Sequence, residues 1–411
     1  MLLEEPADFL QQLASQNQLL ACLQWLGEFQ VLACIPLNGS VPIRDIADLS
    51  GVPEAQLRRV VRMTATSGFL NESQPGYVAH TPLSAPFVTK PLFLDAGMFL
   101  AKSSGPAALQ MASATQRFGN SSRPHESAYN LAFNTSETFE SLCEQRSKVQ
   151  RQWSAYLRYS GETDDVVSDF LTQLDWSSLG NACVVNVGAQ SSKTAMGLAE
   201  RYPALQFIVQ MSEPAHSNGS GSRQKNSSNR APSLPASSRG LKRGPMSPND
   251  ARYSDLSSRI TIQKRTLGTP QTVNDAAVYI LSLPSPSPSL PSHSVIERFA
   301  SDLRAHLGVL HGNSAATLIL TMCPLPKPNT VDPDIEASAR QRDLTFFQLA
   351  NDHRLEVNDV EDVINNARDT MGALVIVNRL RSWKDATMAF GVKYQTYGSH
   401  QHKPKASLSI L

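Results

Sequence analysis

Hydrophobic positions along the chain follow two spacings. Over residues 8–36 and 295–310 apolar side chains recur every three or four positions, which predicts helices with a buried face. Short apolar runs predict strands at 183–187, 205–209, 259–262, 275–281 and 315–322, and a closing strand pair at 374–377 and 389–392. Strands that alternate with helical segments are typical of an α/β fold with a parallel sheet.

The segment from Cys183 to Met211 has the order strand, turn, helix, strand. Gly188 ends the first strand, and a helical pattern from Thr194 to Tyr202 precedes the second. Such a βαβ unit binds nucleotides when its first turn is rich in glycine, because only glycine lets the backbone approach the ligand closely. A carboxylate near the end of the second strand then usually takes the ribose hydroxyls.

This unit resembles the cofactor site of fungal S-adenosylmethionine-dependent O-methyltransferases, whose first strand reads roughly Val-Val-Asp-Val-Gly-Gly-Gly-x-Gly. Gly188 matches that pattern. The departures lie at Asn186, Ala189, Gln190, Ser192 and Met211. Asn186 stands at the aspartate, and Met211 stands where the family places its ribose-binding carboxylate. The resemblance implies a Rossmann-like methyltransferase domain with a degenerate cofactor site. The alternative is a strand and turn of an unrelated α/β domain.

The general base of that family is also missing from its expected place. Residues 275–281 resemble the family strand Ala-Asp-Val-Tyr-Leu-Leu, after which active relatives carry a histidine that deprotonates the substrate hydroxyl. Residues 282–289 read Ser-Leu-Pro-Ser-Pro-Ser-Pro-Ser instead, and these prolines forbid the helical turn that would present a base. His293 lies just beyond and is either a displaced base or a solvent-exposed histidine on a loop. His353 is a further candidate base if the chain is an active enzyme.

Residues 39–80 have the pattern of a winged helix. Ser40 is expected to cap a helix over 43–49, and Pro53 is expected to open a second helix that runs to about Ser67. A wing of two short strands follows. In the resembling methyltransferases the helix before this module helps to build an intertwined dimer, which implies a homodimer through the N-terminal domain.

The second helix of this module carries three arginines on its outer face: Arg58, Arg59 and Arg62. One interpretation is that the helix enters a DNA major groove. The other is a solvated face on a domain that serves dimerisation, because no basic wing accompanies the helix and modules of this kind in methyltransferases do not bind DNA.

We expect three parts: an N-terminal helix with a winged-helix dimerisation domain over residues 1–90, a helical connector over 91–175 with a long helix at 139–159, and a methyltransferase-like domain over 176–400. Residues 214–250 interrupt the last part and consist mainly of Ser, Pro, Asn and Gly, which predicts disorder because little apolar surface is available to bury. The insertion is basic, with Arg223, Lys225, Arg230, Arg239, Lys242 and Arg243. It is either a partner-binding or nuclear-import segment or a tolerated surface insertion.

Composition narrows the class of protein. Lys+Arg number 37 and Asp+Glu number 36, so the chain has no overall electrostatic field that would favour binding to nucleic acid or to a membrane surface. No apolar run approaches the length that spans a bilayer, and no basic segment near the start predicts a secretory signal. The five cysteines share no metal or redox spacing, which indicates reduced thiols of an intracellular protein without a metal site.

The apolar core pattern is kept while the glycine turn, the ribose carboxylate and the base are lost, which indicates a pseudoenzyme with neither catalytic residues nor a cofactor. This combination is similar to the methyltransferase-like transcriptional co-activators of fungal polyketide clusters of the aflatoxin type. That resemblance implies a nuclear protein that binds the Zn₂Cys₆ transcription factor of its cluster, reaches DNA only through it, and raises expression of an aromatic polyketide or mycotoxin pathway. The alternatives are an active O-methyltransferase for a phenolic polyketide and a dead partner subunit of a live one.

Overall fold

The computed structural model describes residues 5–159, 164–212, 256, 258–382 and 384–398. These residues belong to two compact units. The first unit contains the chain up to Val166 with Ser285–Val295 and Pro324–Val357, and the second contains Val167–Pro284, Ile296–Cys323 and the chain from Asn358. The expected domain boundaries at residues 90 and 175 stay predictions. The insertion 214–250, with its predicted disorder, lies outside the described residues.

The first unit begins with a helix that ends earlier than its apolar pattern predicts. Helix α1 spans Pro6–Glu28 and starts with a proline, whose missing N–H costs no hydrogen bond at that position. The chain then turns at Gln30, a non-glycine residue in the left-handed region with φ 52°, and continues as α2, Val31–Cys34. The predicted single helix is therefore two helices, because the turn lets residues from both pack into one apolar cluster.

Two helices and a small antiparallel sheet follow, in the order that the pattern predicts. The helices are α3 (Ile43–Ser50) and α4 (Glu54–Ala65), and the sheet has the order β1 (Val41–Pro42), β3 (Tyr77–His80), β2 (Leu70–Gln74). The helix starts differ from expectation. Pro42 rather than Ser40 precedes α3, and Pro53 precedes α4 instead of opening it. Gly51 ends α3 with φ 67°, a conformation that glycine adopts without steric cost.

Helices from the middle of the chain complete the first unit. They are α5 (Pro86–Thr89), α6 (Pro91–Phe99), a π-helical turn (Leu100–Ser104), α7 (Gly105–Leu109), α8 (Met111–Phe118), α9 (Ala128–Phe133), α10 (Phe139–Gln145), α11 (Ser147–Tyr159) and α16 (Pro333–Ala350). Ser127 and Asn130 form a reciprocal capping box at the start of α9. Leu349 of α16 joins the core of these helices, so a segment late in the sequence belongs to the first unit.

The long helix predicted over 139–159 is interrupted. Arg146 between α10 and α11 is extended, with φ −123° and ψ 96°. The break turns Phe139 and Tyr156 from the two helices toward Phe99, whose ring centroid lies 6.2 Å and 4.8 Å from theirs. Aromatic packing at these distances adds to the stabilisation from burial alone, and it explains why the chain bends here.

The second unit is built on a sheet of order β6-β5-β4-β7-β8-β10-β9. The strands are β4 (Cys183–Ala189), β5 (Gln206–Ser212), β6 (Ile260–Arg265), β7 (Val278–Ser282), β8 (Thr317–Met322), β9 (Gly372–Arg381) and β10 (Met388–Thr396). Strands β4 to β8 pair in parallel, whereas β10 is antiparallel to β8 and to β9. The predicted α/β class with a mostly parallel sheet is confirmed.

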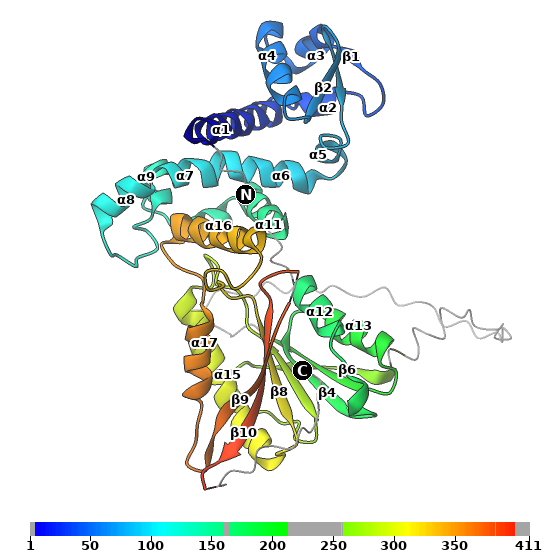
Figure 1. Ribbon diagram of the computed structural model, residues 1–411, viewed down its shortest axis with the longest axis vertical. Helices are drawn as coiled ribbons and strands as arrows, with labels where there is room; N and C mark the ends of the chain where they lie inside the picture. Colours follow the sequence, from blue (N-terminus) through cyan, green and yellow to red (C-terminus); the bar gives the residue numbers. More distant parts are fainter. Residues whose placement is uncertain (1–4, 160–163, 213–255, 257, 383, 399–411) are drawn as a thin grey trace, which may run out of the picture. The chain divides into compact units, whose positions relative to one another are not determined.

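Helices cover both faces of this sheet. Figure 1 shows α12 (Asp164–Thr172) and α13 (Lys193–Arg201) on one face and α15 (Ser292–Gly312) and α17 (Val357–Asn365) on the other. A short 3₁₀ turn at Ser177–Leu179 leads into β4. Apolar residues of α12 and α13 pack against β4, β5 and β7 in the core. The carboxyl ends of β4, β5 and β6 meet at one edge, which is where an open parallel sheet places a ligand.

Candidate functional site

The turn after β4 is the position at which the family resemblance places a cofactor. Gly188 turns the chain with φ 66°, a left-handed conformation that glycine adopts at no steric cost. Beyond it, Ala189 is half-buried, Gln190 is exposed, and the half-buried Ser192 precedes α13. The hydroxyl of Ser192 does not cap the helix, and it donates to the sulfur of Met196 at 3.5 Å.

The two positions at which the family carries carboxylates hold neutral side chains. Asn186 is 6% exposed and lies beside Val209 in the register of β4 and β5. Met211 lies beside Ala189 and packs against the apolar core of the second unit. Neither β4 nor β5 contains an acidic residue. This edge of the sheet therefore offers no negative charge from these two strands to ribose hydroxyls or to a sulfonium.

Protein side chains occupy the space beside Gly188. A Cβ placed on this glycine would lie 3.1 Å from Cδ2 of Leu267 and 3.6 Å from the hydroxyl oxygen of Ser212. Leu267 follows the end of β6, and Ser212 ends β5. The bare backbone of the turn thus packs against a leucine, where a nucleotide-binding turn would leave its backbone to a ligand.

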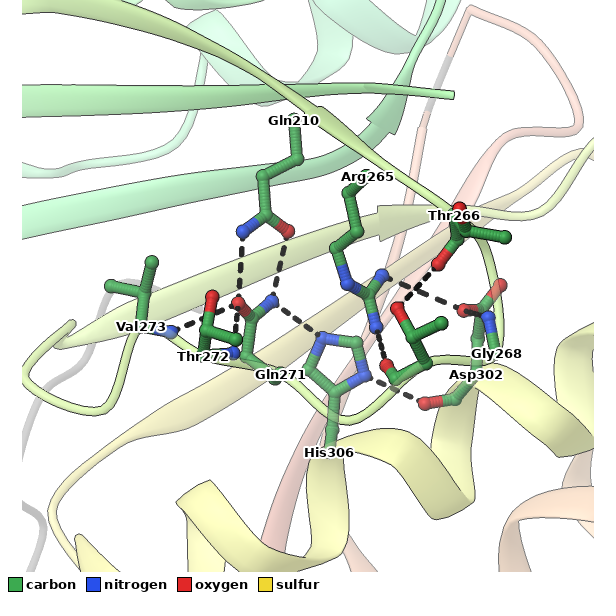
Figure 2. A network of polar contacts seen from close by, with 10 residues as sticks. Gln210, Arg265, Thr266, Gly268, Gln271, Thr272, Val273, Asp302 and His306 are labelled. Carbon is green, nitrogen blue, oxygen red and sulfur yellow. Dashed lines mark hydrogen bonds and ion pairs between the residues drawn. The ribbon is translucent and has the colours of Figure 1, made fainter. Parts of the chain in front are cut away.

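A buried polar network between β5 and α15 holds the segment after β6. Figure 2 shows Gln210 of β5 paired with Gln271 through both side-chain amides, with N–O distances of 2.8 Å and 2.9 Å. Oε1 of Gln271 also accepts from the backbone N–H groups of Thr272 and Val273. The two glutamines are 1% and 6% exposed, so these bonds satisfy amides that water cannot reach.

His306 of α15 extends the network. Its Nδ1 lies 2.6 Å from the backbone oxygen of Asp302 and its Nε2 lies 3.2 Å from the side-chain nitrogen of Gln271. Because a carbonyl can only accept and the amide nitrogen can only donate, these partners assign the proton of the neutral ring to Nδ1. Burial lowers the pKa of His306, the hydrogen bond to Asp302 opposes that shift, and the charge of Arg265 adds to it.

The network ends in a buried ion pair. Nη1 of Arg265 lies 3.7 Å from Oδ1 of Asp302, and their side chains are 7% and 6% exposed. Asp302 accepts from the N–H of Gly268 at 2.8 Å, and Arg265 donates to the backbone oxygen of Thr269. Nε and Nη1 of Arg265 have no hydrogen-bond partner within the part of the chain that the structure describes. Burial lowers the pKa of Arg265, opposed by Asp302. These contacts fix the loop that carries Leu267.

No pattern in the sequence indicates this network. Gln210 and Gln271 are 61 positions apart, and Gln271 and His306 are 35 apart, so no local spacing relates them. The sole local signal is a histidine at the i+4 position from an aspartate on a predicted apolar helix, and that pattern is too common to indicate a site.

The neutral state of His306 predicts a pH dependence of stability. Unfolding returns the ring to a pKa of about 6.5, whereas burial keeps the folded pKa lower. The stability contribution is therefore complete above that value and is lost as the pH falls below it, by at most about 1.4 kcal/mol for each pKa unit of depression. We expect the midpoint of urea unfolding to drop between pH 7.5 and 5.5, and His306→Gln to flatten that drop.

The control for this measurement is His293→Gln, because His293 lies on the same helix and is exposed. This variant should keep the pH profile of the parent chain. An unchanged profile in His306→Gln would show that the acid sensitivity does not arise at His306.

The segment after β7 has no helical turn at the expected place of a base. Residues 283–291 are irregular, and Ser287 and Leu290 exchange two backbone hydrogen bonds of 2.9 Å each. His293 is exposed on the first turn of α15 rather than on a loop. His353 is also exposed and lies 3.3 Å from Asp352. Neither histidine takes part in the polar network.

The three arginines of α4 differ in their surroundings. Arg58 forms an ion pair with Glu54 one turn away. Arg62 bonds Glu72 with both Nε and Nη2 at 2.9 Å and 3.3 Å. Arg59 is exposed. A DNA phosphate at this face would therefore have to compete with two carboxylates.

The remaining expectations concern the basic insertion, the cysteines and membrane-spanning segments. The basic segment with Arg223, Lys225, Arg230, Arg239, Lys242 and Arg243 lies outside the described residues. The five cysteines are free, and within the described ranges no group of three or more His, Cys, Asp or Glu side chains could hold a metal ion. Among the helices that the structure describes, none is long and apolar enough to cross a membrane.

Comparison with known proteins gives several relatives over almost the whole chain. The monodictyphenone cluster transcriptional coactivator of Emericella nidulans is 49% identical, covering 96% of this chain and 86% of the relative. The trypacidin cluster transcriptional coactivator of Aspergillus fumigatus is 46% identical, covering 99% of this chain and 86% of the relative. The aflatoxin cluster transcriptional coactivator of Aspergillus parasiticus is 42% identical, covering 96% of this chain and 86% of the relative. No family model matches the chain.

Solved structures with a similar fold are enzymes. Mitomycin 7-O-methyltransferase matches with a TM-score of 0.58 at 14% identity, over 95% of this chain and 98% of the other. A riboflavin-derivative dimethyltransferase from Streptomyces davawensis matches with a TM-score of 0.60 at 12% identity, over 95% and 99%. A complex of LepI with S-adenosylmethionine matches with a TM-score of 0.59 at 14% identity, over 96% of this chain and 90% of the other. At these identities the likeness describes the fold.

Proposed function

This chain belongs to the family of fungal transcriptional coactivators of secondary-metabolite gene clusters, and we propose that it raises transcription of an aromatic polyketide cluster without catalysing methyl transfer. Its fold is that of a methyltransferase, so the proposal depends on what the sheet edge can bind. The observation that carries it is Leu267, which packs against the backbone of Gly188 where the resembling enzymes receive their cofactor.

The residues at this edge do not fit S-adenosylmethionine as the resembling enzymes hold it. Met211 contributes a thioether to the apolar core in place of a carboxylate, and Asn186 is neutral. The buried ion pair of Arg265 and Asp302 holds the loop that carries Leu267. Moving Leu267 away from Gly188 would therefore require this ion pair to separate. We therefore derive no catalytic step, and we propose that the methyltransferase-like fold serves to bind a protein partner.

We further propose that the partner is the Zn₂Cys₆ transcription factor of the same cluster. The chain has five cysteines without the spacing of a zinc cluster, so it cannot supply that DNA-reading module itself. Two of the three arginines on α4 already bond carboxylates within the module. Both observations support DNA recognition through the partner, and we propose that the chain acts in the nucleus.

The N-terminal helix supports the proposal of a homodimer. Phe9, Leu10 and Leu13 on α1 are 53%, 65% and 46% exposed. A cluster of large apolar side chains on one helix is typical of a surface that another protein covers. A second copy of the chain would cover the helix symmetrically, in keeping with the commonest form of oligomer.

The test is co-purification from the producing fungus at its native level. Tagged chain is expected to retain a Zn₂Cys₆ factor of its own cluster, and deletion of its gene is expected to lower the transcripts of that cluster. Light scattering on the purified chain is expected to give the mass of two copies, and Phe9→Glu with Leu10→Glu is expected to give one. Gln11→Glu is the matched control on the same exposed helix.

Different outcomes separate the alternatives. Retention of a live methyltransferase in place of a transcription factor would support a dead partner subunit. Unchanged cluster transcripts after deletion, together with no zinc-cluster protein in the purified material, would overturn the coactivator mechanism proposed for this chain.

A further inference from the structure

The loop after β6 presents Leu267 in a tight turn. The backbone N–H of Thr269 donates to the oxygen of Thr266 at 3.4 Å, so Leu267 and Gly268 are the two central residues of the turn. Gly268 has φ 76°, a positive value of the kind that a type II turn requires at its third position and that glycine adopts without steric cost. The turn directs the leucine side chain toward Gly188, at the carboxyl end of β4.

Helix α15 holds this turn in place. Asp302 accepts from the N–H of Gly268 at 2.8 Å, and the backbone oxygen of Ala305 accepts from the N–H of Gln271 at 3.0 Å. A Cβ placed on Gly268 would lie 2.5 Å from Oγ of Ser301, so the backbone of the turn approaches α15 more closely than a residue with a side chain allows. The turn therefore leaves its position only if these bonds to α15 break.

Two features of this edge oppose a nucleoside ligand, and they differ in size. The absence of a carboxylate at Met211 removes hydrogen bonds to a charged group, which corresponds to about a ten- to hundredfold loss of affinity. A ligand atom between Leu267 and Gly188 would need about 3.5–4.0 Å to the carbon atoms on each side. Cδ2 of Leu267 lies only 3.1 Å from the Cβ position of Gly188. The missing carboxylate weakens a ligand, whereas the leucine excludes it.

We propose that the side chain of Leu267 closes this edge of the sheet to nucleosides, and that the neutral residues at Asn186 and Met211 are the smaller obstacle. The leucine takes the place of a ligand on the Gly188 turn, so the edge is packed without a cofactor. This inference rests on the proposed function, because a chain that acts only through a protein partner must keep its fold without a bound nucleoside.

The test is calorimetric titration of S-adenosylhomocysteine into full-length variants. The parent chain and Met211→Asp are expected to release no heat up to about 1 mM ligand. Leu267→Ala combined with Met211→Asp is expected to bind saturably below about 0.1 mM, at least about tenfold tighter than that limit. The truncation removes the atoms that reach Gly188 and keeps the backbone bond between Gly268 and α15.

A second pair of changes guards against a folding defect at the half-buried Met211. Leu267→Ala combined with Asn186→Asp restores a carboxylate with almost no change of shape, and it is also expected to bind below about 0.1 mM. The matched control is Val273→Ala combined with Met211→Asp, because Val273 is half-buried in the same loop and lines a hollow beside α15. This control should bind no ligand. Melting temperatures identify any variant that has not folded.

The proposal is overturned if Met211→Asp binds equally well with Leu267 and with alanine at that position, because the missing carboxylate would then be the main obstacle. It is also overturned if both double variants fold and neither binds the ligand. These outcomes leave the coactivator proposal intact, because retention of the transcription factor and the cluster transcripts are measured separately. Binding by the parent chain would contradict both the closure by Leu267 and the proposed loss of the cofactor site.

Discussion

Replacement of Asp302 by alanine is expected to destabilise the second unit by about 3–5 kcal/mol, the usual cost of removing one partner from a buried ion pair. The guanidinium of Arg265 would stay buried without its counter-charge, since both side chains are less than a tenth exposed. The N–H of Gly268 would also lose its acceptor. The urea dependence of hydrogen exchange in β5 and β7 measures this change, because it reports on this unit by itself.

The matched control is Glu297→Ala, which removes an exposed carboxylate from the same helix. A surface substitution of this kind should change the free energy of unfolding by less than about 0.5 kcal/mol. The double variant Arg265→Met, Asp302→Leu is expected to recover much of the loss, because apolar residues of similar size often replace buried ion pairs at little cost. If Asp302→Ala behaved like the control, water would have to solvate Arg265 in place of the carboxylate.

Titration of S-adenosylmethionine into the purified chain is expected to release no heat up to about 1 mM ligand, so that binding is weaker than about −4.1 kcal/mol. The physical reason is local. Leu267 packs on Gly188, and the two strand positions that carry acids in the resembling enzymes are Asn186 and Met211. The same result is expected for S-adenosylhomocysteine, because both ligands share the nucleoside.

An active fungal O-methyltransferase at the same concentrations is the control for the titration. A micromolar dissociation constant for this chain would mean that other groups replace the lost carboxylates. It would return the active O-methyltransferase to first place among the functions, with His293 and His353 to be tested as bases. Methyl transfer to a phenolic polyketide would be the measurement that follows.

The strands and helices of the second unit could be predicted because their signals are local. Each apolar run from Cys183 to Val392 became a strand within a few residues of its predicted position. Apart from the small shifts at the starts of α3 and α4, the helix predictions for the first unit were wrong where the chain breaks a predicted single helix, at Gln30 and at Arg146. At both, the chain leaves the helix so that side chains on either side of the break can reach a common core. Hydrophobic periodicity indicates that a helix has a buried face. It does not indicate where the chain leaves one helix and packs against a different element.

The sequence by itself determined the α/β class, the order of the strands along the chain and the substitutions at Asn186 and Met211, because these depend on residue types at short spacing. Only the tertiary structure decided that Leu267 lies against Gly188, and that the ion pair of Arg265 and Asp302 holds the loop of Leu267. These contacts join residues from separate strands and helices. Their geometry is set by sheet register and helix packing, which no local pattern of residues encodes.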